Sequence, residues 1–138
     1  MINDQLAYEL KRAGLSWQPA ERDFFIIPEH NLDGQIFVVS ELPALVQVFG
    51  GEPTITFHGS IEWALDSIVL AEAVWLPTET QLRQRLAGMI GADAPLRLDR
   101  TGSGYRLKIA HKADLLEFDA AHAEDVYAQA LLYVLKHN

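Results

Sequence analysis

The chain has 138 residues, no cysteine and a formal net charge of −8. A chain of this length buries enough surface to fold without a disulfide or a metal ion, and the lack of cysteine excludes thiolate chemistry and fits a reducing compartment. The acidic balance argues against nucleic acid and anionic membrane as partners, because phosphate groups attract clustered Lys and Arg. The sequence has no signal-peptide pattern and no apolar run of about 20 residues, so we expect a soluble cytoplasmic protein.

Short elements fill the first part of the sequence. Asn3 is a good helix N-cap and Gly14 a good stop signal, so we predict a helix over residues 4–13. Two apolar runs, at residues 24–27 and 36–39, are separated by turn residues. We expect these runs to be strands that pair as a hairpin.

The next stretch has two interpretations. Residues 44–49 and 54–57 have the composition of two strands joined by a turn at Gly50 and Gly51. Alternatively, Ser40 caps a short helix over residues 42–49.

Helix and strand signals then alternate. Ser60 is a good N-cap for a helix that extends to Ile68, and residues 73–76 form a short strand stopped by Pro77. The sequence Thr78-Glu79-Thr80-Gln81 is a capping box, in which the two polar side chains satisfy each other's free backbone donors. It predicts a further helix that ends at Gly88 or Gly91.

From Pro95 the apolar period changes to two. Residues 96–99 and 105–109 alternate apolar and charged side chains around a turn, which predicts an antiparallel hairpin with one solvent-exposed face. Residues 115–118 add a third strand, and the apolar C-terminal helix packs across the three strands.

These elements predict one α+β domain over residues 1–138, with about four helices packed on a largely antiparallel sheet. No linker-like or low-complexity segment divides the chain. A weak repeat suggests two related halves, because Gln5-Leu6 and Gln81-Leu82 each open a helix and precede a proline by the same interval.

The C-terminal helix carries the strongest prediction. Its charged entry leads into residues 128–135, whose apolar side chains point nearly all the way round a helix. The sheet can cover one face only, so the remainder requires a second element or a second copy of the protein. The interface candidates are Trp63, which lies off the apolar face of its own predicted helix, and the helix residues Tyr127, Leu131, Leu132 and Leu135.

A pocket is the alternative site. His58 and Ser60 place a base and a hydroxyl side by side where a strand enters a helix, and Asp66 or Glu62 can orient the imidazole. Helix capping already explains Ser60, however, and the sequence is not a nucleophile elbow. The five histidines lack metal-ligand spacing and no glycine motif cradles a phosphate, so we expect no metal and no cofactor.

The predicted C-terminal hairpin also carries a strip of basic residues. Asp99 and Glu117 can lie opposite these cations, so we expect cross-strand ion pairs on a solvated sheet rather than a nucleic-acid interface. The strip consists of Arg97, Arg100, Arg106 and Lys108.

Three motifs span most of the chain: Leu10-x-x-Ala13-Gly14-Leu15-x-Trp17-x-Pro19, Trp75-Leu76-Pro77-Thr78, and Ala128-x-Ala130-Leu131-Leu132-Tyr133-Val134-Leu135. In these motifs the chain resembles a set of short bacterial proteins of unknown function, some of which carry a pilus-assembly label. The motifs consist of packing, capping and turn residues, so the resemblance implies a shared fold and an accessory role in an assembly. It carries no catalytic residue across, and the phosphate loop of the pilus-localisation ATPases is missing.

The expected function is non-catalytic. We expect a small protein that acts through protein–protein contacts, with a homodimer as the simplest case. The alternative is a small-molecule binder or hydrolase with a pocket near His58 and Ser60.

Overall fold

The computed structural model describes residues 1–28, 35–39, 44–49, 52–57 and 67–138. Its contacts divide the chain into two compact units. The terminal unit combines residues 1–15 with residues 77–138, and the inserted unit consists of residues 16–76. The expectation of one domain over the whole chain stays a prediction.

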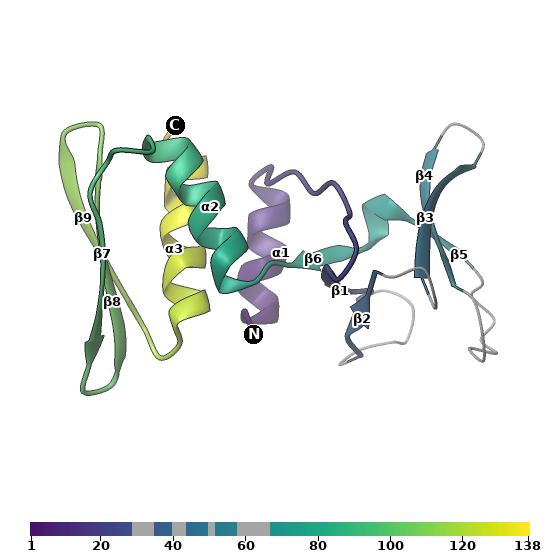
Figure 1. Ribbon diagram of the computed structural model, residues 1–138, viewed down its shortest axis with the longest axis horizontal. Helices are drawn as coiled ribbons and strands as arrows, with labels where there is room; N and C mark the ends of the chain where they lie inside the picture. The colour runs from purple at the N-terminus through teal and green to yellow at the C-terminus, as the bar shows by residue number, and fades with distance from the viewer. Residues whose placement is uncertain (29–34, 40–43, 50–51, 58–66) are drawn as a thin grey trace. The chain divides into compact units, whose positions relative to one another are not determined.

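The terminal unit contains three α-helices and one three-stranded antiparallel sheet of order β7-β8-β9. Helix α3 contacts β8 and β9, and it also contacts both other helices (Figure 1). The C-terminal helix therefore packs on the sheet, as predicted. In chain order the elements are α1 (Asp4–Arg12), α2 (Glu79–Ile90), β7 (Leu96–Thr101), β8 (Gly104–His111), β9 (Asp114–Ala120) and α3 (Ala123–Lys136).

The predicted helix caps at Asn3 and Thr78 are confirmed. The side chain of Asn3 accepts hydrogen bonds from the backbone N–H groups of Gln5 and Leu6, at 2.9 and 3.2 Å. At the start of α2, the amide oxygen of Gln81 accepts from the N–H of Thr78 at 2.9 Å, and the Thr78 hydroxyl accepts from the N–H of Gln81 at 3.3 Å. These bonds satisfy donors that a helix start otherwise leaves free.

Helix α3 is covered on more than one side. Tyr127 interacts with Arg83 of α2, whereas the ring of Tyr133 lies 6.0 Å from that of Phe118 on β9. Burying each large apolar side chain stabilises the fold by about 1.5–3 kcal/mol. The second covering element required by the sequence is thus present within the chain, as α1 and α2. The buried residues of α3 are Ala123, Val126, Tyr127, Ala128, Ala130, Leu131 and Val134.

Two antiparallel three-stranded sheets form the inserted unit. One has the order β2-β1-β6 and the other β3-β4-β5. Both predicted hairpins are confirmed, and the stretch with two interpretations is a strand. The strands are β1 (Phe24–Ile26), β2 (Phe37–Val38), β3 (Ala44–Phe49), β4 (Glu52–Phe57), β5 (Ser67–Val69) and β6 (Val74–Leu76), with a short 3-10 turn at Leu70–Glu72.

The prediction of four helices is wrong for the part of the chain that the structure describes, which contains three α-helices. The predicted fourth helix falls largely on residues 58–66, which lie outside the described residues. Its expected end, Ile68, instead belongs to β5 and pairs with Ile55 of β4. The β-branched residues Ile68 and Val69 favour a strand, and pairing with β4 satisfies their backbone groups.

The two weakly repeated halves are not found either. A repeat would give both halves the same sheet, yet the strands between α2 and α3 form one sheet and those between α1 and α2 form two. In addition, α1 packs on α3, from the other end of the sequence, within the terminal unit. The shared Gln-Leu pairs therefore mark two helix starts and not a duplicated unit.

None of the helices in the described part of the chain combines the length and the apolar character that a membrane crossing requires.

Aromatic side chains build the core of the inserted unit around Phe25 and Ile27, which are fully buried. Trp17 lies against this core, with its ring stacked at 5° and 6.3 Å from that of Trp75. The indole N–H of Trp17 donates to Oδ2 of Asp23 at 2.9 Å. Trp17 thus joins the core to a buried carboxylate.

We expect Trp17→Phe to lower the free energy of unfolding of the inserted unit by about 1–3 kcal/mol, because it removes a hydrogen bond from the buried carboxylate of Asp23. The backbone N–H of Ala20 also donates to Oδ2 at 3.0 Å and would remain as a partner. Denaturant unfolding measures the change, with Glu21→Gln as control at an exposed acid in the same turn. Equal stability of the two variants would contradict the role given to the indole N–H.

Burial raises the pKa of Tyr127 above its ordinary value, and Arg83 opposes this change. The folded protein therefore holds the phenol proton at a pH where the unfolded chain has already released it. The resulting contribution to stability is complete below the ordinary pKa and is lost as the pH rises through the raised pKa.

We accordingly expect the stability of the terminal unit to fall with pH above about pH 10, and the fall to be shallower in Tyr127→Phe. Urea unfolding at a series of alkaline pH values measures this slope. Tyr8→Phe, at an exposed tyrosine of α1, is the matched control and should keep the wild-type slope. Identical slopes in Tyr127→Phe and wild type would show that Tyr127 contributes nothing to alkaline unfolding.

Candidate functional site: the outer face of the C-terminal sheet

The predicted pocket lies outside the described residues, because His58, Ser60 and Asp66 all fall within residues 58–66. The interface candidate Trp63 falls there too. Among the residues that are described, no three His, Asp or Glu side chains gather as metal ligands would. The pocket and Trp63 therefore stay predictions.

The interface candidates on α3 are mostly enclosed. Tyr127 and Leu131 have exposed fractions of 2% and 0%, while Leu132 and Leu135 are half-buried. The first two side chains are covered within the terminal unit and cannot contact a partner directly. Since α1 and α2 provide the cover that the sequence requires, the apolar character of α3 no longer argues for a second copy at this helix.

The sheet of the terminal unit has one face that packs on α3 and one that does not. Leu107 and Ile109 of β8 are buried, and side chains alternate between faces along a strand. The residues between them point the other way. We call this surface the outer face, and it consists of Arg97, Asp99, Arg106, Lys108, Ala110, Leu115, Glu117 and Asp119.

Ion pairs cross the outer face from strand to strand, and Glu117 takes part in them as predicted. Asp99, the other predicted partner, pairs along its own strand, and the cross-strand pair of Asp119 was not predicted. Arg106 on β8 donates from Nε to Oδ1 of Asp119 on β9 at 2.9 Å, and the Nζ of Lys108 lies 3.7 Å from a carboxylate oxygen of Glu117. The hydrogen bond and the charge of Asp119 raise the pKa of Arg106 above its ordinary value. Exposed pairs of this kind contribute little stability each, so their arrangement matters more for recognition.

The basic strip needs one correction. Arg97 pairs with Asp99 on the outer face, with 3.0 Å between Nε and Oδ1. Arg100 lies three residues after Arg97 in the same strand, so strand alternation places it on the opposite face. The outer face therefore carries three cations and three carboxylates and has no net formal charge.

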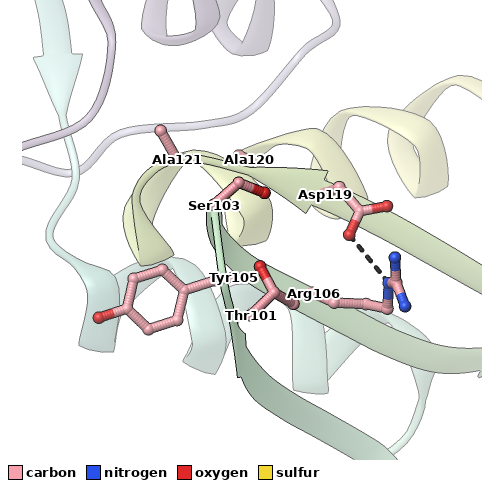
Figure 2. A pocket seen from close by; sticks show the side chains of 7 residues that line it. All are labelled: Thr101, Ser103, Tyr105, Arg106, Asp119, Ala120 and Ala121. Carbon is pink, nitrogen blue, oxygen red and sulfur yellow. Dashed lines mark hydrogen bonds and ion pairs between the residues drawn. The ribbon is translucent and has the colours of Figure 1, made fainter.

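A polar hollow of about 330 Å³ lies at one end of the sheet, beside the turn between β7 and β8. In Figure 2 the side chains of Arg106 and Asp119 point toward each other, while Tyr105 points in the opposite direction. The hollow offers hydroxyl groups and one guanidinium that a carboxylate already holds. Such a set can hydrogen-bond a polar group but contains no paired nucleophile and base. Its lining residues are Thr101, Ser103, Tyr105, Arg106, Asp119, Ala120 and Ala121.

Gly104 makes this end of the sheet possible. Its φ of 154° favours glycine, and a Cβ added there would lie 2.7 Å from the Cα of Ala121 and closer still to the carbonyl oxygen of Ala120. The backbone of β8 can approach the end of β9 this closely only without a side chain.

An apolar hollow of about 250 Å³ lies further along the strands. Leu115 borders it and is 88% exposed, beside Ala110 on the neighbouring strand. Leu115 is not among the interface residues predicted from the sequence. The sequence does contain a signal for its exposure. Side chains alternate along a strand, so Leu115 shares the solvated face with Glu117 while Leu116 points the other way. The lining residues are Pro95, Arg97, Lys108, Ile109, Ala110, Leu115, Leu116 and Glu117.

A tight turn holds Leu115 in place. His111 pairs with Asp114, so Lys112 and Ala113 form a two-residue hairpin loop, with φ values of 51° and 68°. Positive φ at both positions is the pattern of a type I′ turn, which usually contains Asn or Gly. Lys112 also donates from Nζ to the carbonyl oxygen of His137 at 2.8 Å, which ties the turn to the end of α3.

No protein-family model, curated protein or solved structure matches this chain. The resemblance to short bacterial proteins therefore stays a prediction.

We expect Ala113→Gly to stabilise the terminal unit by about 0.5–1 kcal/mol, because relief of the left-handed conformation outweighs the added entropy of the unfolded chain. Thermal or urea unfolding measures the gain. Ala92→Gly is the control, at an exposed alanine without positive φ, and should destabilise slightly. A loss of stability in both variants would contradict the strain assigned to the turn.

Proposed function

We propose that the protein is non-catalytic and acts through protein–protein contacts made by the outer face. The observation that carries this proposal is Leu115, a largely exposed leucine beside an apolar hollow. The ion pair of Lys108 with Glu117 borders the hollow on the side away from the turn between β8 and β9. Protein interfaces usually combine an apolar patch with polar groups beside it.

The chemistry of the outer face supports contact rather than catalysis. Its cations and carboxylates pair with one another, as in Arg106 with Asp119, instead of facing an enclosed cavity. Paired charges at a rim contribute mainly to the selection and orientation of a partner. The proposal includes a cytoplasmic location, which the lack of cysteine supports. It also includes the accessory assembly role that the resemblance implies.

Site-specific photo-crosslinking in cells that express the protein tests the proposal. A photoreactive side chain at Leu115 should form covalent adducts with protein at least about 5-fold more often than one at Gln84, which lies exposed on α2. The reason is that only the first position lies within the proposed contact. Equal or absent adduct formation at Leu115 would remove the outer face as a protein-binding surface.

A further inference from the structure

We infer that the outer face binds the outer face of a second copy of this chain across a two-fold axis. This inference rests on the proposed function and names its partner. A two-fold interface brings the same surface together twice, so the surface must be complementary to itself. The register of β8 and β9 determines which side chains of the outer face lie side by side, and therefore whether the face is complementary to itself.

Neighbouring positions on β8 and β9 carry complementary groups. Arg106 lies opposite Asp119 and Lys108 opposite Glu117, so the outer face of β8 is basic where that of β9 is acidic. The next row along the strands pairs Ala110 with Leu115, a small side chain with a large exposed one. In each row, a side chain of β8 thus lies beside one of opposite charge or of complementary size on β9.

Consider a two-fold axis that runs parallel to the strands, above the outer face and over the gap between β8 and β9. Rotation about this axis exchanges the positions of the β8 and β9 side chains. It places β8 of one copy over β9 of the other without a shift along the strands. Each cation of β8 then faces a carboxylate of the other copy, and each Leu115 faces Ala110 at the apolar hollow. Two sheets that pack face to face keep their strands nearly aligned, as this arrangement requires.

The charge balance of the outer face also favours a second copy. A strongly charged partner would meet as many like charges as opposite ones, since three cations and three carboxylates share the surface. A second copy related by this axis meets opposite charges in both rows. Because much of the contact consists of exposed charges, we expect a dimer that weakens as salt is added.

Single charge reversals give a sharp test. In Lys108→Glu, positions 108 and 117, which lie side by side, are both acidic. In Glu117→Lys both positions are basic. Each variant alone should dimerise at least about 10-fold more weakly than wild type, because like charges then face each other across the axis. An equimolar mixture should form heterodimers, since the all-acidic row of one chain would then face the all-basic row of the other, and should recover to within about 3-fold of wild type.

Sedimentation of the full chain at low salt, at concentrations up to roughly 100 μM, measures these equilibria. Circular dichroism checks that each variant is folded, since an exposed ion pair contributes only about 0.2–1 kcal/mol to stability. Asp93→Lys is the control for charge, at an exposed loop position outside the face, and should dimerise like wild type.

A wild-type chain that stays monomeric, or variants that associate equally well alone and mixed, would overturn the inference. The proposed function has a separate test. Adducts of Leu115 with a different protein, together with a monomeric wild-type chain, would leave that proposal standing and reject the second copy. Absence of any adduct at Leu115 together with a monomeric chain would reject both.

Discussion

Helix α3 has buried side chains on more than one side, and its enclosure determines the organisation of the terminal unit. The sheet covers it at β8 and β9, and α1 and α2 cover what remains. At about 1.5–3 kcal/mol for each large apolar side chain, this burial is a large share of the few kcal/mol by which domains are stable. The first and last parts of the sequence therefore belong to one unit, although residues 16–76 separate them.

The same burial fixes the composition of the outer face. Since Leu107 and Ile109 must face α3, the residues that alternate with them along β8 must face away. A shift of the register by one residue would place charges against α3 and leucines in solvent. The rows of complementary side chains across β8 and β9 consequently follow from the packing of a helix on the other side of the sheet.

Local signals predicted much of this fold. The caps at Asn3 and Thr78 and the hairpins depend on neighbouring residues, and the structure has them where the sequence indicated. Long-range packing was not predictable in the same way, because nothing near α1 indicates that it packs on α3. The Ser60 cap signal predicts a helix that includes Ile68, but the β-branched pair Ile68 and Val69 favours the strand that pairs with β4. The candidate surface was predicted only in part. A cross-strand ion pair was expected at Glu117 and is present, but the one expected at Asp99 is not, because Asp99 pairs along its own strand. The exposure of Leu115 depends on a turn that lacks the usual Asn or Gly.

That turn connects the outer face to the helix behind the sheet. Lys112 takes up a left-handed conformation and its ammonium group hydrogen-bonds the carbonyl oxygen of His137, at the C-terminal end of α3. A cation at this end also interacts favourably with the helix dipole. The position of Leu115, three residues beyond Lys112, is thus held from both sides of the sheet: by pairing with Ala110 on the neighbouring strand, and by the contact of Lys112 with α3. A contact surface gains affinity when its apolar side chains are held rigid before binding, because less conformational entropy is then lost.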